Sequence, residues 1–250
     1  MTTGRFRTEQ GLSVTAITAA QMREVDRVAM EDFDLGILQM MENAGRNLAE
    51  NVIDMVGGTR GEIVVLAGGG GNGGGGLCCA RHLHNRGFLV EVALDRNVGA
   101  LKGAAAAQWR ILQAAGFESL TPDDAAPALG RADLVIDAVI GYSLRGTPRG
   151  RAAKLIALCN EHAARVLALD VPSGLDATSG ETPGLAVRAE RTLTLALPKT
   201  GLFSIWGDLY LADIGIPPEV YEQLGVAYEP PFRAHYWLKL ERDTGFQKVP

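Results

Sequence analysis

The 250-residue sequence has no excess of positive charge: 24 Lys and Arg stand against 29 Asp and Glu, giving a net charge of −5 and an isoelectric point near 5.4. Without a basic field, nucleic acid and anionic membrane surfaces are not expected as partners. No stretch approaches the roughly 18 consecutive apolar residues of a membrane span. The opening MTTGRFRTEQGLSV also lacks the apolar segment of a secretory signal.

Cysteine and histidine are also scarce. Three cysteines, two of them adjacent at Cys78 and Cys79, give no disulfide framework and no zinc-ligand spacing. His82 and His84 stand two apart in a helical segment, so they cannot share one face as ligands. The remaining histidines have no partner in sequence, and serine-hydrolase chemistry therefore has no support. These features predict a reduced, cytoplasmic protein.

From residue 62 onward, short apolar runs alternate with helical segments. The runs are EIVVLA, FLVEVALD, DLVIDAVIG, RVLALDVP, RTLTLALP and DLYLADIGIP. Runs that are apolar on both faces are typical of buried parallel strands. Helices are expected between them at 77–86, 103–115 and 149–164, after two leading helices at 18–33 and 37–55. The pattern predicts an α/β fold: an open, doubly wound, mostly parallel sheet with helices on both faces. A domain over 1–226 is followed by a C-terminal tail, 227–250, with clustered prolines, aromatics and charges.

In such a sheet, ligands bind beyond the carboxyl ends of the strands. Polar residues and glycines gather where three runs end. The first run leads into the glycine segment 68–76, and the third, which carries Asp137, leads into 141–147. The fourth ends at Asp170, with Ser173 shortly after it. We therefore expect these features to meet at one edge of the sheet.

The segment 68–76 reads GGGGNGGGG, eight glycines around Asn72. A glycine-rich turn into a helix exposes backbone N–H groups and suits a phosphate. Gly68, Gly70 and Gly73 match the dinucleotide fingerprint, with Asp95 ending the next strand. Because any glycine run satisfies that pattern, a flexible surface loop is the alternative. Asn72 favours a binding role, since it places one side-chain amide in a segment whose other residues have no side chain.

Two aspartates lie within or at the end of apolar runs. Asp137 must find N–H donors, a cation or a raised pKa, and so serves either a ligand or a neighbouring loop as a cap. Asp170 has the same two interpretations, and the Pro-Ser-Gly turn after it favours function. Ser173 alone is uninformative, because turn serines commonly bond their own backbone.

The order of several motifs resembles the NAD(P)H-hydrate epimerase family, the YjeF N-terminal domain, over about residues 17–217. The motifs are QMREVDRVAM, MMENAG, the glycine segment with LCCARHL, LVIDAVIGYSLRGTPRG, LALDVPSGLDATSGE, LALPKTGL and LADIGIP. The resemblance implies a Rossmann-like three-layer sandwich. It also implies an isomerase that interconverts the R and S forms of hydrated NADH and NADPH (NADHX and NADPHX), a reaction of nucleotide repair.

The resemblance further implies a functional partner, an ATP- or ADP-dependent NAD(P)H-hydrate dehydratase that is fused to the epimerase in many bacteria. Since this sequence stops at 250, a stand-alone epimerase is expected. A homodimer is implied as well, with Tyr236 and Trp237 as candidate contacts.

The resemblance also implies site residues, which are assigned to the matching positions of this sequence. Asp170 corresponds to a substrate-binding acid and is the candidate for catalytic proton transfer. A potassium ion would be held by Asn72, Asp137 and Ser173, since hard cations prefer oxygen ligands. Together with Asp170, the implied nucleotide-binding residues are Gly71, Asn72, Gly73, Gly74, Gly75, Gly141, Tyr142, Ser143, Leu144, Arg145, Gly146 and Thr147.

One departure leaves other functions open. Gly75 stands where the family loop usually has an aspartate that faces the ligand. This favours the alternative of a non-catalytic nucleotide-sensing or scaffold module on the same fold. A second alternative is an NAD-dependent oxidoreductase that uses Asp95 on the ribose. The two leading helices and the absence of a Tyr-x-x-x-Lys motif count against it.

Overall fold

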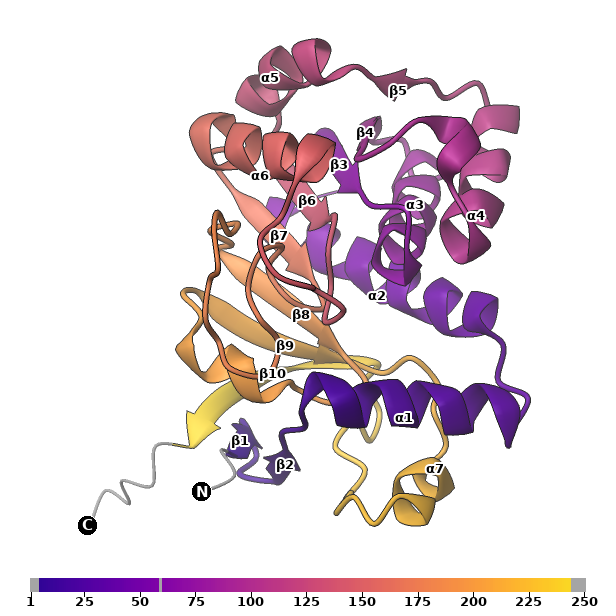
Figure 1. The fold of residues 1–250 in the computed structure, drawn as a ribbon, viewed down its shortest axis with the longest axis vertical. Helices are drawn as coiled ribbons and strands as arrows, with labels where there is room; N and C mark the ends of the chain where they lie inside the picture. The colour runs from indigo at the N-terminus through magenta and orange to yellow at the C-terminus, as the bar shows by residue number, and fades with distance from the viewer. Residues whose placement is uncertain (1–4, 59, 244–250) are drawn as a thin grey trace.

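The computed structural model describes residues 5–58 and 60–243, which are built around one ten-stranded sheet (Figure 1). The strand order is β2-β1-β10-β9-β8-β7-β6-β3-β4-β5. The strands are β1 (Arg5–Thr8), β2 (Ser13–Thr15), β3 (Glu62–Ala67), β4 (Leu89–Leu94), β5 (Ser119–Leu120), β6 (Leu134–Ala138), β7 (Val166–Leu169), β8 (Arg191–Leu195), β9 (Asp208–Ala212) and β10 (Trp237–Asp243). From β5 to β9 every neighbouring pair is parallel, whereas β10, β1 and β2 pair antiparallel.

Helices cover both faces of the sheet, which confirms the predicted α/β fold. One face carries α2 (Ile37–Val56), α3 (Gly71–His84) and α4 (Gly103–Ala114), and the other carries α5 (Pro122–Arg131) and α6 (Gly150–His162). Helix α1 (Ala19–Glu31) and the short α7 (Pro218–Gln223) contact one another near β9 and β10 (Figure 1). Among the described residues, no helix is long and apolar enough to cross a membrane.

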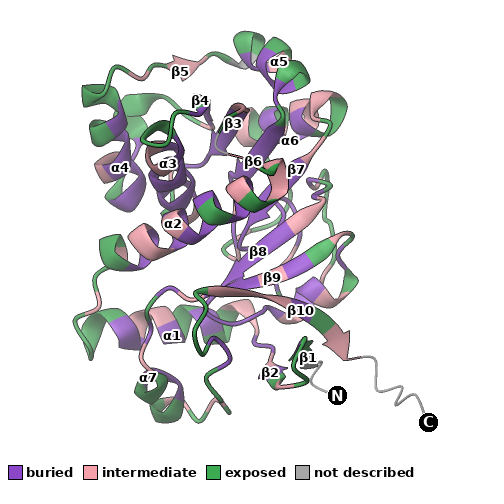
Figure 2. Cartoon of the chain, turned by 180° about the vertical axis from the view of Figure 1, so that it is seen from behind, coloured by how far each residue is buried: buried purple, intermediate pink, exposed green. Residues whose placement is uncertain are grey.

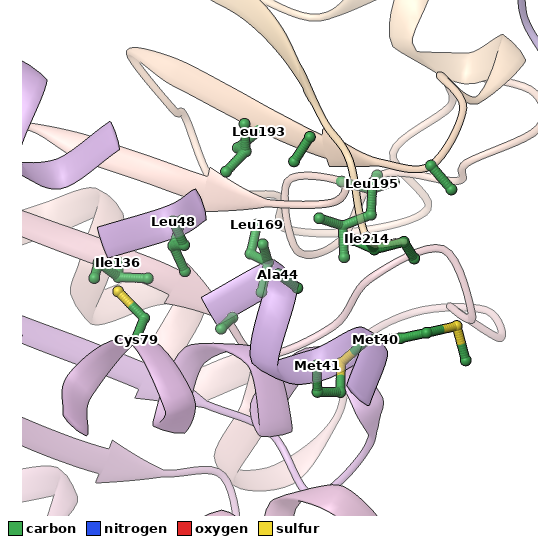
Figure 3. Packing of buried hydrophobic residues seen from close by; sticks show 14 of the residues in the cluster. Met40, Met41, Ala44, Leu48, Cys79, Ile136, Leu169, Leu193, Leu195 and Ile214 are labelled. Carbon is green, nitrogen blue, oxygen red and sulfur yellow. The ribbon is translucent and has the colours of Figure 1, made fainter. Parts of the chain in front are cut away.

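The central strands separate two hydrophobic clusters. Alternate residues of β3 face opposite layers: Val65 belongs to the cluster with α2, α3 and α4, and Val64 to the cluster with α5 and α6. Strands buried on both faces appear purple in Figure 2. On the first side, Met41 and Ala44 of α2 pack close to Leu169 of β7 (Figure 3). The continuous apolar runs of the sequence therefore reflect burial on two faces.

Several elements differ from the sequence-based expectation. Two strands, β1 and β2, precede the two predicted leading helices. Residues 237–243 of the predicted tail form β10, which lies between β9 and β1 in the sheet, while residues 244–250 lie outside the described part. Trp237 of β10 donates a hydrogen bond to Glu50 within the chain. Helices α5 and α7 and strand β5 were not expected, because α5 contains Pro127 and the other two are short.

The chain changes direction across the sheet at β3. Strand β4 lies on one side of β3 and β6 on the other. Such a switch point opens a crevice beyond the carboxyl ends of the two strands. Here that crevice lies between the glycine segment after β3 and the segment after β6.

Candidate active site

The glycine segment forms the start of α3. Helix α3 begins at Gly71, so most of the glycines predicted to form a loop are helical. A Cβ at residue 73 would lie 1.7 Å from the carbonyl oxygen of Gly68, and one at residue 76 would lie 2.5 Å from Cβ of Ala138. The glycines are therefore required for the close approach of α3 to the turn and sheet below it.

The segment after β6 meets this helix end. A Cβ at residue 141 would lie 2.9 Å from a carboxylate oxygen of Asp170 and 3.1 Å from the amide of Asn72, so glycine is needed there. Oriented for hydrogen bonding, the Asn72 amide donates to the Leu169 carbonyl at 3.2 Å and accepts from the Gly141 N–H at 3.3 Å. The segments that carry Asn72, Gly141 and Asp170 thus converge at one point.

Asp170 is held in a buried ion pair. It follows β7 with a φ of 67°, in the left-handed region that non-glycine residues seldom adopt. One carboxylate oxygen accepts from Lys199 Nζ at 2.5 Å and the other from the backbone N–H of Tyr142 at 2.9 Å. Lys199 is fully buried and also donates to the Leu195 carbonyl at 2.8 Å. A lysine with no exposure is rare unless it is paired, and Asp170 is that partner.

A second carboxyl group faces the same region from α1. The Tyr142 hydroxyl lies 2.5 Å from a carboxylate oxygen of Asp26. Burial raises the pKa of Asp26, against the opposing effects of the Tyr142 hydrogen bond and the charge of Lys199; the nearby charge of Asp170 adds to the rise. Asp26 and Asp170 therefore differ in environment, since only Asp170 pairs directly with a cation.

Asp137 and Ser173 form a separate, fully buried pair. Ser173 Oγ lies 2.6 Å from one Asp137 oxygen, and the Ser173 backbone N–H donates to the other at 2.7 Å. The N–H of Val139 completes the set at 3.3 Å. Burial raises the pKa of Asp137 to about 6, despite these hydrogen bonds. The Ser173 hydroxyl also accepts from the Ile140 N–H, which links this pair to the segment that contacts Asn72.

Two adjoining cavities open at this edge of the sheet. The first, of about 450 Å³, is lined by Asp26, Tyr142, Asp170, Lys102 and apolar side chains such as Met41. The second, of about 440 Å³, is lined by Asp95, Arg96, Arg149 and neighbouring residues. Both share Gly69, Gly70, Gly71, Asn72, Gly141 and Ser143. They form one site: the first cavity holds Asp26 and Asp170 with Lys102, and the second holds Arg96 and Arg149 with Asp95.

The predicted residues divide between the cavities and the structure beneath them. Gly71, Asn72, Gly141, Tyr142, Ser143 and Asp170 line the cavities just described. Ser143, Leu144, Arg145 and Thr147 line a further cavity, of about 430 Å³. Gly73, Gly74 and Gly75 are buried in α3. A Cβ at residue 75 would lie 2.9 Å from Leu169 Cδ2, so glycine at this position allows close packing with β7.

Two residues of the acid–base region, Asp26 and Lys199, were missed from the sequence, as were the basic side chains of Arg96, Lys102 and Arg149 that line the cavities. Asp26 lies in QMREVDRVAM and Lys199 in LALPKTGL, two motifs used only as part of the overall resemblance. The available signal for Lys199 was a single cation after an apolar run. Its burial depends on Asp170, 29 residues earlier along the chain, and no local pattern shows that pairing.

A larger cavity, of about 630 Å³, lies elsewhere and is lined by Pro172, Leu185 and Trp206 among others. It contains neither of the buried carboxyl groups nor the start of α3. Size alone therefore does not locate the chemistry, and the cavities at the sheet edge combine the acid–base groups with a helix N-terminus.

Comparison with known proteins then decides the family. The model of the YjeF-related protein N-terminus matches residues 37–201. The chain belongs to this family. It is 48% identical over 240 residues to the NAD(P)H-hydrate epimerase of Dehalogenimonas lykanthroporepellens, covering 94% of this chain and 97% of that protein. It is 35% identical to the NAD(P)H-hydrate epimerase of Rhodopirellula baltica, covering 86% and 90%.

Two further comparisons concern a longer bifunctional relative and a solved structure. The bifunctional NAD(P)H-hydrate repair enzyme Nnr of Moorella thermoacetica is 37% identical over 82% of this chain, but the match spans only 41% of that longer protein. The crystal structure of the yeast protein ynu0 has the same fold, with a TM-score of 0.79 at 21% identity over 90% of this chain and all of that one. Family and fold thus agree with the expectation from the motifs.

Proposed function

We propose that this chain is an NAD(P)H-hydrate epimerase that interconverts the R and S forms of hydrated NADH and NADPH. The observation that carries this assignment is the 48% identity to a protein of that name over nearly the full length of both chains. The site fits the reaction, because one cavity offers two carboxyl groups in different environments beside a second cavity that holds Arg96 and Arg149. An NAD-dependent oxidoreductase has no comparable support, and Asp95 is paired with Arg96 at 2.7 Å.

The cavity with the two arginines suits the diphosphate of the nucleotide. The first backbone N–H groups of α3 have no partners within the helix, and the helix dipole favours an anion there. Arg96, Arg149 and Lys102 line the adjoining walls. We place the diphosphate at Gly70–Asn72 between these side chains. This orientation directs the hydrated nicotinamide ring toward Asp170 and Tyr142.

The chemistry requires an acid and a base. The hydrate carries a hydroxyl group on the ring carbon next to the ring nitrogen. Inversion by loss and return of water requires one proton to be given to the departing hydroxyl on one face of the ring. A second proton must be removed from the incoming water on the opposite face. We assign Asp170 as the base, because its charge is balanced by Lys199 and its second oxygen is fixed by the Tyr142 N–H. We assign Asp26 as the acid, acting through the Tyr142 hydroxyl.

In this scheme the Tyr142 hydroxyl gives its proton to the departing hydroxyl as protonated Asp26 gives its own to Tyr142. The carbon–oxygen bond breaks, water leaves, and the ring nitrogen stabilises the positive charge. Water then adds to the opposite face and Asp170 accepts its proton. The enzyme ends with Asp26 ionised and Asp170 protonated, the state required for the reverse direction or for proton return through water.

The Asp26 assignment predicts a pH dependence. Because the acid acts in its protonated form and burial raises its pKa, turnover from R to S should fall as pH rises through the Asp26 pKa. Asp26→Asn should lower kcat by about 10²-fold and remove that alkaline limb. Tyr142→Phe should do the same. The matched control is Glu24→Gln on the exposed side of α1, which should retain both the rate and the profile. An unchanged alkaline limb in Asp26→Asn would overturn this assignment.

We also propose that Asn72, Asp137 and Ser173 hold a potassium ion. The donor set fits a hard cation, since it offers an amide oxygen, a carboxylate and a hydroxyl. Asp137 is a fully buried carboxylate with no cationic side chain among its bonded partners. In the alternative orientation of the Asn72 amide, its oxygen faces the Leu169 carbonyl oxygen, an arrangement that a bound cation favours. When bound, the ion would supply fixed positive charge near the substrate.

This ion should be detectable from stability. Melting in KCl should occur at a higher temperature than in tetramethylammonium chloride of equal concentration, by about 2–4 °C per kcal/mol of binding free energy. Ser173→Ala and Asp137→Asn should remove the difference between the two salts, whatever their effect on the baseline melting temperature. Equal melting of the unmodified protein in both salts would contradict the proposal.

The activity itself is tested by starting from one purified epimer of hydrated NADH and separating R and S by chromatography over time. The epimerase predicts approach to an equilibrium mixture much faster than in buffer. A nucleotide-sensing or scaffold module would bind nucleotide without accelerating the exchange. A dehydratase specific for the S form is the expected functional partner, in keeping with the bifunctional relatives. The homodimer remains a prediction.

A further inference from the structure

A second cluster of ligand-type side chains lies outside the cavities, where α2 crosses α3. Cys78 and His82 are four residues apart on α3, so both side chains face the same neighbour. That neighbour is Glu42 of α2. One Glu42 oxygen lies 3.3 Å from Cys78 Sγ, and the other lies 2.9 Å from His82 Nε2. The thiol sulfur, a ring nitrogen and a carboxylate oxygen all lie within 4.8 Å of one another.

We propose that Glu42, Cys78 and His82 form a three-residue binding site for Zn²⁺, with a fourth position open to water. Thiolate, imidazole and carboxylate are the ligands that zinc takes in proteins. Tetrahedral coordination at the usual bond lengths separates the ligand atoms by about 3.3–3.7 Å. Two of the separations, 3.3 Å from Glu42 to Cys78 and 2.9 Å from Glu42 to His82, are near these values, and all three ligand atoms lie within 4.8 Å of one another, so side-chain movements would bring them onto one ion. On binding, the Cys78 thiol releases its proton to solvent.

A cationic side chain, that of Arg81, already lies against Glu42 and Cys78. Its guanidinium lies 2.5 Å from Glu42 and 3.3 Å from Cys78 Sγ, and it balances the charge of the carboxylate. The arginine comes from the same helix and remains partly exposed, as does Glu42. Zinc with one thiolate and one carboxylate would leave no net charge, so Arg81 is free to turn toward solvent when the metal enters.

The spacing of the cysteines and histidines along the sequence gives no zinc motif, because the third ligand of this cluster would be a glutamate. Glu42 lies 36 residues before Cys78, and only the packing of α2 on α3 brings the three together. A metal here would join the two helices that supply Met41, Gly71 and Asn72 to the cavity.

The test uses Co²⁺ as a spectroscopic substitute for zinc on the full-length protein. One equivalent of Co²⁺ should give a thiolate-to-cobalt charge-transfer band and the visible bands of tetrahedral cobalt, and Zn²⁺ should remove both. Cys78→Ser should abolish the charge-transfer band. His82→Asn and Glu42→Gln should each weaken binding by at least about tenfold. Cys159→Ala, in α6 on the other face of the sheet, is the matched cysteine control and should keep the bands.

A further variant tests whether Arg81 competes with the metal for the three ligands. Arg81→Gln keeps all three ligands and removes the competing cation, so it should bind Co²⁺ and Zn²⁺ severalfold more tightly. Circular dichroism establishes that each variant is folded before titration. The proposal is overturned if the unmodified protein gives no thiolate band at a tenfold excess of Co²⁺. It is equally overturned if the band persists in Cys78→Ser. These readouts do not use epimerase activity, so they stand apart from the assignment of the reaction.

Discussion

Asp170→Asn is expected to lower epimerase turnover by about 10²–10⁴-fold, the usual contribution of a positioned acid–base group. The amide cannot accept a proton from water at the ring carbon. Asparagine is the suitable replacement because it tolerates the left-handed φ of 67° and still offers one oxygen to Lys199. Nucleotide binding should remain, since the backbone groups at the start of α3 are untouched.

The matched control is Asp133→Asn. Asp133 precedes β6 at the opposite edge of the sheet, where its carboxylate accepts from the Glu62 N–H at 2.8 Å. The same chemical change there should leave kcat unaltered. Initial rates from a purified epimer measure both variants. A rate of R-to-S conversion in Asp170→Asn equal to that of the unmodified protein would remove Asp170 from the mechanism.

Lys199→Met is expected to destabilise the fold by about 3–5 kcal/mol, because it leaves the Asp170 carboxylate buried without its cation. The side chains of Lys199 and Asp170 are only 1% and 5% exposed. Urea denaturation measures the loss, and turnover should fall with it because Asp170 loses the hydrogen-bond donor that holds its carboxylate in position. Lys239→Met is the matched control. Its partner Asp208 is half exposed, so that pair should contribute only about 0–1 kcal/mol.

The double variant Asp170→Asn with Lys199→Met distinguishes an unpaired charge from lost packing. Removing both charges should restore much of the stability lost in Lys199→Met, while turnover stays low. Additive losses of stability in the two single variants would indicate that the ion pair is not the cause.

The strands that were predicted best from the sequence are those with buried residues on both faces. The apolar runs that became β3, β4, β6 and β7 were recognised because residues on both of their faces are buried in the two hydrophobic clusters, whereas the buried apolar residues of β8 and β9 belong to one cluster alone. Strand β10 reads WLKLERD, and charges at alternate positions gave no such signal. Its place between β9 and β1 depends on pairing between the two ends of the described chain, which no local pattern encodes.

The glycine segment shows a different limit of prediction from sequence. Glycine has low helix propensity, so a loop was the natural prediction. The helix forms because Gly73 and Gly76 allow contacts that a Cβ would block. Among site residues, Asp170 and Tyr142 were reached through motifs at strand ends. Asp26 comes from a helix remote in sequence, and its role follows only from the 2.5 Å contact with Tyr142.

The most direct test of the proposed site is a crystal structure of Asp170→Asn with bound hydrated NADH. The epimerase mechanism predicts that the ring carbon bearing the hydroxyl lies between residue 170 and the Tyr142 hydroxyl, with the diphosphate at the start of α3 near Arg96 and Arg149. A ring bound in the cavity lined by Pro172 and Trp206, or turned away from both groups, would contradict it.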